Sequence, residues 1–406
     1  MTDPLARRAE ELDAADPLAA LRDRFVPAAD VVAYLDGNSL GRPIAGTAER
    51  LAAFVRDGWG GRLIRGWNEG WLAEPERLGD RIGRVALGAA AGQTLVGDST
   101  TVLLYKAIRA ALAARPDRTE IVLDAANFPT DRYLLAGIAA ELGHRLVVLD
   151  PPVDGGVTAA MVADAVGPRT ALVLLSHVAF RSGYMTDAAA ITRITHEAGA
   201  LVVWDLSHST GAVPVALDAW DADLAAGCTY KYLNGGPGAP AFVYVASRLQ
   251  DELCQPIQGW LGTADPFRMG EHYEPATGVR RFTSGTPPVI GMLPIADMLT
   301  LIEEAGLPAV RAKSVALTGF AIEIADALLA PEGVRVESPR DAARRGSHVT
   351  LAHPRFAALL EPLWRRGVVP DFREPDGLRI GLSPLSTSFQ EVLTGLTAVQ
   401  KELVGG

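Results

Sequence analysis

The chain has 406 residues, enough for two or three domains at roughly 150 residues each. With 49% hydrophobic and 21% charged residues, its composition is that of a folded globular protein and excludes disorder as the main state. The net charge of −10 and the absence of a basic block argue against nucleic acid or an acidic membrane surface as a partner. The two cysteines, Cys228 and Cys254, are too few for a disulfide framework and favour a cytoplasmic location. We also expect neither a signal peptide nor a membrane span, because no apolar run approaches the ~20 residues that cross a bilayer.

The first half of the chain predicts a doubly wound α/β sheet. Residues 1–45 are turn-rich, and a helical pattern over about 46–92 is interrupted by the aromatic, glycine-rich stretch 58–71. A helix is expected from about Thr101 to Ala114. Short, nearly continuous apolar runs then alternate with helical stretches, as buried parallel strands and their crossover helices do. The predicted strands are 120–124, 145–150, 171–176 and 200–205, the helices between them are 131–143, 158–167 and 187–199, and further strands are expected within 223–238 and at 241–246.

The last part of the chain predicts a smaller α+β domain. A long helical pattern over 308–329 precedes extended segments at 333–339, 348–353 and 377–384, with a helix near 356–367. We therefore divide the chain into an N-terminal segment that joins the small domain (1–45), a large α/β domain (46–289) and a small C-terminal domain (290–406).

An aspartate and a lysine stand at neighbouring strand ends of the predicted sheet. Asp205 ends an apolar strand, and Lys231 lies in the glycine-rich segment 227–238. Ligands of open α/β sheets bind at this edge. Pyridoxal phosphate needs such a pair, because a lysine forms the aldimine with its aldehyde and a carboxylate keeps its pyridine nitrogen protonated. Asp205 could also cap a turn and Lys231 could be a surface lysine, but the other three lysines (Lys106, Lys313 and Lys401) lie in helices or the C-terminal tail.

Two further segments could bind the same cofactor. Thr100 and Thr101 open an apolar helix whose N-terminus is a natural anion site, although ordinary N-capping by Ser99 or Thr100 is the alternative. Phe128 and Asp131 follow the strand 120–124; the ring could stack on a cofactor and the carboxylate could bond to it, but a Phe-Pro turn is often only a turn. Arg379 could bind a substrate carboxylate or be a surface arginine. The seven histidines show no metal-ligand spacing, so no metal site is expected.

Six motifs in order, at 34–41, 127–131, 204–212, 227–238, 255–262 and 282–292, resemble those of the kynureninases. These are fold-type-I, class V aminotransferase-like pyridoxal-phosphate enzymes, and the resemblance runs from about residue 30 to 390. It implies a mainly parallel sheet covered by helices on both faces, with a smaller α+β domain. It also implies hydrolysis of the Cβ–Cγ bond of L-kynurenine to anthranilate and L-alanine, a step of tryptophan catabolism by the kynurenine pathway and of NAD biosynthesis.

The resemblance assigns roles residue by residue. It implies that Lys231 forms the Schiff base and that Asp205, supported by His208, faces the pyridine nitrogen. For the reaction itself, we favour Tyr230 as the proton donor. The other cofactor contacts implied are Thr100, Thr101 and Tyr230 at the phosphate, Phe128 on the ring, Asp131, and Trp260 and Thr286 from a neighbouring subunit of a homodimer with shared sites. The substrate contacts implied are Arg379 at the α-carboxylate and Thr286, Trp67 and Asn68 near the aromatic ring.

Three alternatives remain open from the sequence. The enzyme could prefer 3-hydroxykynurenine or another substituted kynurenine in a biosynthetic pathway, since Thr286 stands where some relatives have asparagine. It could be another class V lyase such as a cysteine desulfurase, which needs a thiol on a mobile loop. Here Cys228 is expected to be buried and Cys254 to lie in a helix over 247–254. A cofactor-holding but inactive binding protein is the third alternative.

Overall fold

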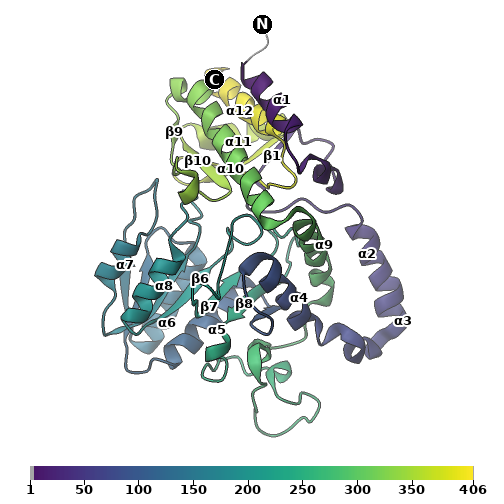
Figure 1. Cartoon of the computed structure of the whole chain (residues 1–406), viewed down its shortest axis with the longest axis vertical. Coiled ribbons are helices and arrows are strands. Elements are labelled where there is room, and N and C mark those ends of the chain that lie inside the picture. The colour runs from purple at the N-terminus through teal and green to yellow at the C-terminus, as the bar shows by residue number, and fades with distance from the viewer. Residues whose placement is uncertain (1–3, 406) are drawn as a thin grey trace.

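Seven strands form the larger of two sheets in the computed structural model, which describes residues 4–405 (Figure 1). Their order is β2-β8-β7-β6-β5-β3-β4, and only β8 runs against the others. Every residue of β3, β6 and β8 is buried, so helices and loops must cover both faces of the sheet. This arrangement agrees with the predicted α/β class. The strands are β2 (Thr94–Gly97), β3 (Glu120–Asp124), β4 (Arg145–Leu149), β5 (Thr170–Ser176), β6 (Leu201–Asp205), β7 (Leu224–Gly227) and β8 (Ala241–Val245).

The helices of this larger unit begin and end where local signals place them. Ser99 caps the first long helix by accepting a hydrogen bond from the backbone N–H of Val102, and Asp187 caps another in the same way through Ala190. Gly143 ends a third helix in the left-handed conformation. The helices are α4 (Glu74–Ile82), α5 (Thr100–Ala113), α6 (Pro129–Leu142), α7 (Ala159–Ala165), α8 (Ala188–Glu197) and α9 (Val289–Ala305).

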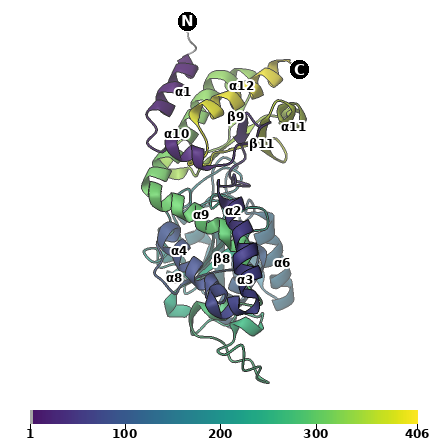
Figure 2. The same ribbon diagram turned by 90° about the vertical axis from the view of Figure 1, so that its right-hand side faces the viewer.

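The second sheet has the order β1-β11-β12-β10-β9 and lies at the other end of the molecule (Figures 1 and 2). Its first strand comes from the N-terminal segment and pairs in parallel with β11, whereas the other pairs are antiparallel. Both chain ends lie on this unit (Figure 2). Its elements are β1 (Ala33–Leu35), β9 (Arg335–Val336), β10 (His348–Ala352), β11 (Val368–Arg373), β12 (Gly377–Gly381), α1 (Pro4–Ala14), α10 (Leu307–Ile324), α11 (Phe356–Arg365) and α12 (Phe389–Gly405).

Two clusters of buried apolar side chains correspond to the two sheets. The two clusters divide within α10: Val310, near its start, belongs to the larger cluster, whereas Leu317 belongs to the smaller one. The N-terminal segment is divided, because Phe25 packs in the larger cluster and Leu35 in the smaller. The domain limits expected from the sequence stay predictions. Residues 1–3 and 406, at the ends of the first and last predicted domains, lie outside the described part of the chain.

Helix α10 of the small unit bears on the expectation that the chain has no membrane span. The helical segment Leu307–Glu332 is long and apolar enough to cross a membrane by length and composition, contrary to the prediction that no run approaches that length. Half of its apolar window is buried, and Leu317, Phe320 and Ile324 lie in the core of the small unit. Core helices of folded proteins meet the same criterion, so the finding is weak support for a span.

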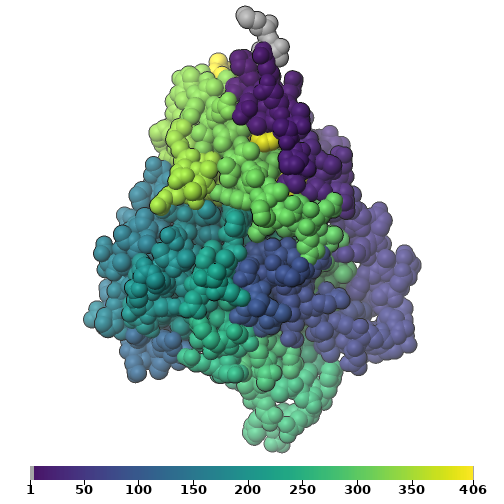
Figure 3. Space-filling view, viewed as in Figure 1, coloured from purple at the N-terminus to yellow at the C-terminus, as the bar shows by residue number. Residues whose placement is uncertain are grey.

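Two segments project from the large unit. One runs through α2 (Thr47–Ala53) and α3 (Gly60–Arg62), and the other is the loop after the short helical turn Trp260–Gly262, which forms the lower end of the molecule (Figures 1 and 3). The helix expected over 247–254 is wrong, because only Ser247–Leu249 is helical and Cys254 lies exposed beyond a turn. The side chain of Gln250 donates to the carbonyls of Gly92 and Val245, and these tertiary contacts hold the chain in the turn.

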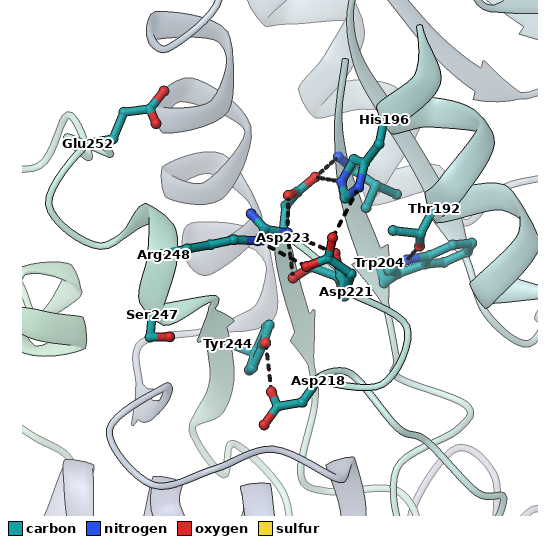
Figure 4. Close-up of polar contacts among 12 residues, drawn as sticks. Thr192, His196, Trp204, Asp218, Asp221, Asp223, Tyr244, Ser247, Arg248 and Glu252 are labelled. Carbon is teal, nitrogen blue, oxygen red and sulfur yellow. Dashed lines mark hydrogen bonds and ion pairs between the residues drawn. The ribbon is translucent and has the colours of Figure 1, made fainter. Parts of the chain in front are cut away.

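The amino-terminal edge of the large sheet is tied by a network of charged groups (Figure 4). Asp223, which precedes β7, is fully buried and accepts hydrogen bonds from the Val202 backbone N–H at 2.7 Å, His196 Nε2 at 2.9 Å and Arg248 Nη2 at 2.7 Å. These contacts join α8, β6, β7 and the segment after β8 at the edge opposite the one where Asp205 lies.

Candidate active site

Lys231 lies at the carboxyl-terminal edge of the large sheet, in the loop between β7 and β8. Its Nζ is 3.0 Å from His208 Nε2 and 5.8 Å from the centre of the Phe128 ring. Asp205, the last residue of β6, is buried, and its Oδ1 accepts a hydrogen bond from the Ser207 backbone N–H at 2.8 Å. The fold thus brings together residues from three strand ends that are far apart in the sequence, as expected for an open α/β sheet.

A glycine from the N-terminal segment makes room for this lysine loop. The backbone N–H of Gly41 donates to the Tyr230 carbonyl at 2.9 Å. A side chain at Gly41 would meet the Lys231 carbonyl oxygen at 2.5 Å and the Asn234 side chain at 2.4 Å. Only a glycine permits this close approach. The motif at 34–41 therefore contributes to the site by packing against the loop that carries the lysine.

His208 is a neutral imidazole that accepts from the lysine. Burial, and then the positive charge of Lys231, lower the pKa of His208 well below its usual value. A neutral ring can accept a hydrogen bond at Nε2, where Lys231 lies, and it then carries its proton at Nδ1. That Nδ1 is buried and has no hydrogen-bond partner in the described residues.

Asp131 faces the same space from the first turn of α6. Burial, followed by the neighbouring Asp205 carboxylate, raises the pKa of Asp131 well above its usual value. Its Oδ2 is buried without a partner among the described groups. The raised pKa favours the protonated carboxyl, which could donate a hydrogen bond to a ligand in this space.

An anion cradle lies beside this group, at the N-terminus of α5. The cavity there measures about 440 Å³ and is lined by Thr100, Thr101, Tyr230 and Thr286. Ser99 is the N-cap of α5, so N-capping explains that residue. Thr100 and Thr101 line the cavity and are therefore available to a ligand. Free backbone N–H groups, hydroxyls and the helix dipole together suit a phosphate. Burial raises the pKa of the Tyr230 hydroxyl, which therefore keeps its proton at neutral pH.

Arg379 approaches from the small unit and is almost fully buried. Its Nη2 lies 2.7 Å from Asp371 Oδ2 and donates to Ser39 Oγ at 2.8 Å, and its Nη1 donates to the Phe180 carbonyl at 2.8 Å. Because Asp371 stands directly opposite Arg379 in the β11–β12 ladder, the sheet itself fixes this ion pair. The surface-arginine alternative is therefore excluded for Arg379.

The structure adds a residue that the sequence analysis missed. His348, the first residue of β10, is fully buried, and its ring centre lies 5.3 Å from that of His208. Neither ring nitrogen meets strict hydrogen-bond geometry among the described groups. Burial, and then the charges of Arg379 and Lys231, lower the pKa of His348 well below its usual value. The backbones of Phe180 and Arg181 lie close enough to the ring to oppose this shift in part. The alternation of β10 puts His348 on an inward face, but only the packing of the two units shows that it meets His208.

Three predicted site residues lie away from this centre within the single chain. Trp67 and Trp71 line an open apolar groove with Phe54, and the exposed Asn68 stands beside them. Trp260 is 43% exposed on the projecting loop. Cys228 is buried as expected and Cys254 is exposed, and both are free thiols.

The residues present fit pyridoxal phosphate. The unpartnered Asp131 Oδ2 and His208 Nδ1 are buried polar atoms beside Lys231, and an extended polar ligand would give such atoms partners. An amine, a buried carboxylate, an aromatic face and an anion cradle match the aldehyde, pyridine nitrogen, ring and phosphate of this cofactor.

Comparison with solved structures defines the class of fold. A cysteine desulfurase from Thermococcus onnurineus NA1 superposes with a TM-score of 0.80 and 18% identity, covering 100% of this chain and 99% of that one. The cysteine desulfurase CsdA of Escherichia coli gives a TM-score of 0.81 at 17% identity, over 95% of this chain and 98% of that one. The fold is therefore that of the class V, fold-type-I enzymes, as predicted.

Comparison with known sequences defines the family. The kynureninase of Pseudomonas fluorescens is 43% identical over 389 residues, which cover 94% of this chain and 91% of that protein. A kynureninase of Burkholderia pseudomallei is 42% identical over 388 residues, with the same coverage. A family model described as the kynureninase C-terminal domain matches residues 310–399. The chain belongs to the kynureninase family. The resemblance and the expected pyridoxal-phosphate-dependent kynureninase activity are thereby confirmed, while the substrate preference stays open.

Proposed function

We propose that this enzyme hydrolyses the Cβ–Cγ bond of L-kynurenine to give anthranilate and L-alanine, and that Lys231 is its central catalytic residue. The observation that carries the proposal is the position of the Lys231 amine, which contacts His208 and faces the Phe128 ring near the buried Asp205. Two of the three remaining lysines are engaged elsewhere, since the buried amines of Lys106 and Lys313 form ion pairs with Asp98 and Asp16.

Pyridoxal phosphate supplies an electron sink for carbanion chemistry at the substrate Cα. Asp205 would hold the proton on the pyridine nitrogen, while Phe128 packs on the ring and Asp131 donates to its polar edge. Thr100, Thr101 and Tyr230 would bind the phosphate. Once free, the Lys231 amine would take the proton from Cα as general base. The neutral His208 beside it accepts a hydrogen bond from Nζ and thereby orients the amine.

Two further groups would act on the substrate itself. Arg379 would bind the α-carboxylate, since its buried guanidinium is held in a fixed orientation by Asp371, Ser39 and the Phe180 carbonyl. Tyr230 would return a proton to the alanine part after bond cleavage, because burial keeps its hydroxyl protonated. The hydrolytic water would add at the carbonyl carbon, Cγ.

The aromatic ring of the substrate would lie toward Thr286, Trp67 and Asn68. Thr286 lines the phosphate cavity, and the groove with Trp67 continues along Pro287 and Pro288. A threonine hydroxyl at this place could accept or donate a hydrogen bond to a ring substituent. A preference for 3-hydroxykynurenine or another substituted kynurenine is therefore the second candidate. A cysteine desulfurase is supported by likeness of fold alone, and the thiol of Cys228 is buried.

The proposal includes a homodimer with shared sites in the cytoplasm. Trp260 is exposed on the projecting loop, and the apolar groove at Trp67 is open, so both could reach a second copy. Two free cysteines favour a reducing compartment. The net charge of −10 argues against nucleic acid as a partner, and the half-buried α10 argues against a membrane.

Anthranilate fluorescence after mixing the enzyme with L-kynurenine tests the activity. Lys231→Ala should lose turnover by about three orders of magnitude or more, together with the visible absorbance of lysine-bound cofactor. Lys401→Ala, on an exposed part of α12, is the matched control and should change neither. Turnover at the parent rate in Lys231→Ala would contradict the assignment. Comparing kcat/KM for kynurenine and 3-hydroxykynurenine decides between the two substrates.

A further inference from the structure

The phosphate cavity has an electrostatic feature that its proposed role does not explain. Among the described residues that line it, only Asp98 carries a formal charge, and that charge is negative. A carboxylate beside a phosphate dianion repels it in a partly desolvated site. Asp98 is also held in the left-handed conformation, with φ of 45°, although it is not a glycine. The fold therefore places the Asp98 carboxylate beside the anion cradle at the N-terminus of α5.

A buried lysine is paired with this acid. Lys106, in the second turn of α5, has no exposed surface, and its Nζ lies 2.5 Å from Asp98 Oδ2. The same Nζ donates to the Phe282 carbonyl at 2.7 Å. Burial lowers the pKa of the Lys106 amine, while the hydrogen bond and charge of Asp98 raise it. The two residues thus form one coupled unit behind the helix N-terminus.

The pair also connects the three segments that surround the cavity. Lys106 belongs to α5, Asp98 to the loop before it, and Phe282 to the segment that continues to Thr286. Ser284, in that segment, lies with its Oγ 3.5 Å from Asp98 Oδ2. An ion pair buried for stability alone gains little over apolar side chains of the same size. Its place at the edge of the anion site points to another use.

We propose that Lys106 is a positioning residue of the phosphate site, which cancels the charge of Asp98 and fixes the loops that present N–H and hydroxyl groups to the cofactor phosphate. This inference rests on the proposed phosphate role of Thr100 and Thr101. When the positive charge of Lys106 balances the negative charge of Asp98, a phosphate dianion interacts with the helix dipole and uncharged donors. Without Lys106, the dianion is repelled by an unpaired carboxylate.

The ratio of the dissociation constants for pyridoxal and pyridoxal phosphate isolates the phosphate contribution, because the two ligands share every other group. Both constants are measured on the full-length protein, freed of cofactor, from the visible absorbance on titration. Lys106→Met should lower this ratio about tenfold or more by weakening pyridoxal phosphate binding alone. The double variant Asp98→Asn/Lys106→Met removes both charges and should restore the ratio to within about threefold of the parent value.

Two outcomes would overturn the inference: an unchanged ratio in Lys106→Met, or a double variant that remains as impaired as the single one. The single variant Asp98→Asn serves if Lys106→Met does not fold; it should keep or raise the ratio, and a tenfold loss would contradict the proposal.

Thr100→Val separates this inference from the site on which it rests. A ratio unchanged by Thr100→Val would overturn the phosphate site itself. If Thr100→Val lowers the ratio of the two dissociation constants but Lys106→Met does not, only the role of Lys106 is overturned.

Discussion

The two edges of the large sheet differ in how their buried ionisable groups are paired. At the amino-terminal edge, Asp223 meets His196, Arg248 and a backbone N–H, so both of its oxygens have partners. At the carboxyl-terminal edge, His208 and Asp131 each leave a buried polar atom without one in the described residues. Folded proteins pair nearly all such groups. The unpaired edge is therefore the one arranged to receive a ligand, and the paired edge serves stability.

The histidines at the two edges show the same contrast in their protonation. The hydrogen bond to Asp223 raises the pKa of His196, so folding favours its charged form. Burial lowers the pKa of His208, so folding favours its neutral form. A raised pKa contributes stability below the usual histidine range, and this contribution is lost as pH rises. A lowered pKa contributes stability above that range, which is lost as pH falls.

After Lys231→Ala, the largest effect is expected from Arg379→Lys, whose side chain reaches the site from the small unit. A lysine cannot reproduce the fork that binds a carboxylate and contacts Asp371 and Ser39, so kcat/KM for kynurenine should fall about 100-fold or more. Arg373→Lys is the matched control, because Arg373 donates to the same Asp371 carboxylate at 2.9 Å from a more exposed position. Equal losses in both variants would show that the Asp371 pair, not substrate binding, is responsible.

At the paired edge, Asp223→Ala should reduce stability rather than turnover. The variant leaves the Val202 N–H and two cationic partners without their acceptor. The free energy of unfolding should fall by about 2–3 kcal/mol, a modest value because Arg248 is partly exposed to water. Asp221→Ala is the control: Asp221 contacts the same Arg248 and His196 but is 68% exposed. The control should lie within about 0.5 kcal/mol of the parent in denaturant unfolding. A larger loss of kcat than of stability in Asp223→Ala would contradict the division of roles.

His348→Leu tests the cost of an unpaired buried imidazole. The leucine removes two unpartnered nitrogens, so stability at pH 8 should stay equal or rise. Because the lowered pKa of His348 makes the parent lose stability as pH falls below about 6.5, the variant should gain about 2 °C in Tm over the parent near pH 5.5. His272→Leu, at an exposed histidine, should show no such pH-dependent difference. A variant that loses the same stability on acidification as the parent would show that His348 takes up no proton on unfolding.

The smallest effect is expected from His196→Gln, which keeps a hydrogen-bond donor to Asp223 but removes the charge. The raised pKa makes the parent more stable than this variant at pH 5.5, by less than about 1 kcal/mol since the ring is partly exposed. The difference should shrink as pH rises toward 8.5, because His196 then loses its charge. Unfolding curves at the two pH values measure it, and a difference independent of pH would assign it to packing.

Much of the fold follows from local pattern. The strands at 120–124, 170–176 and 201–205 read as continuous apolar runs because both faces of the sheet are covered. The expected helix over 247–254 failed because Gln250 finds partners on Gly92 and Val245, which no local pattern shows. The expectation of no membrane span stays a prediction: α10 meets the length and composition criterion, but it is apolar where it packs in the small core.

The sequence by itself determined the family, through its six motifs. It also showed which residue types are available for cofactor chemistry, because Lys231 and Asp205 stand at predicted strand ends. Only the tertiary structure decided which groups meet. The contact of His348 with His208, the pair Asp371–Arg379 and the pair Asp98–Lys106 depend on strand register and on the packing of distant segments. Burial then sets the protonation of these groups, and burial is a property of the folded chain alone.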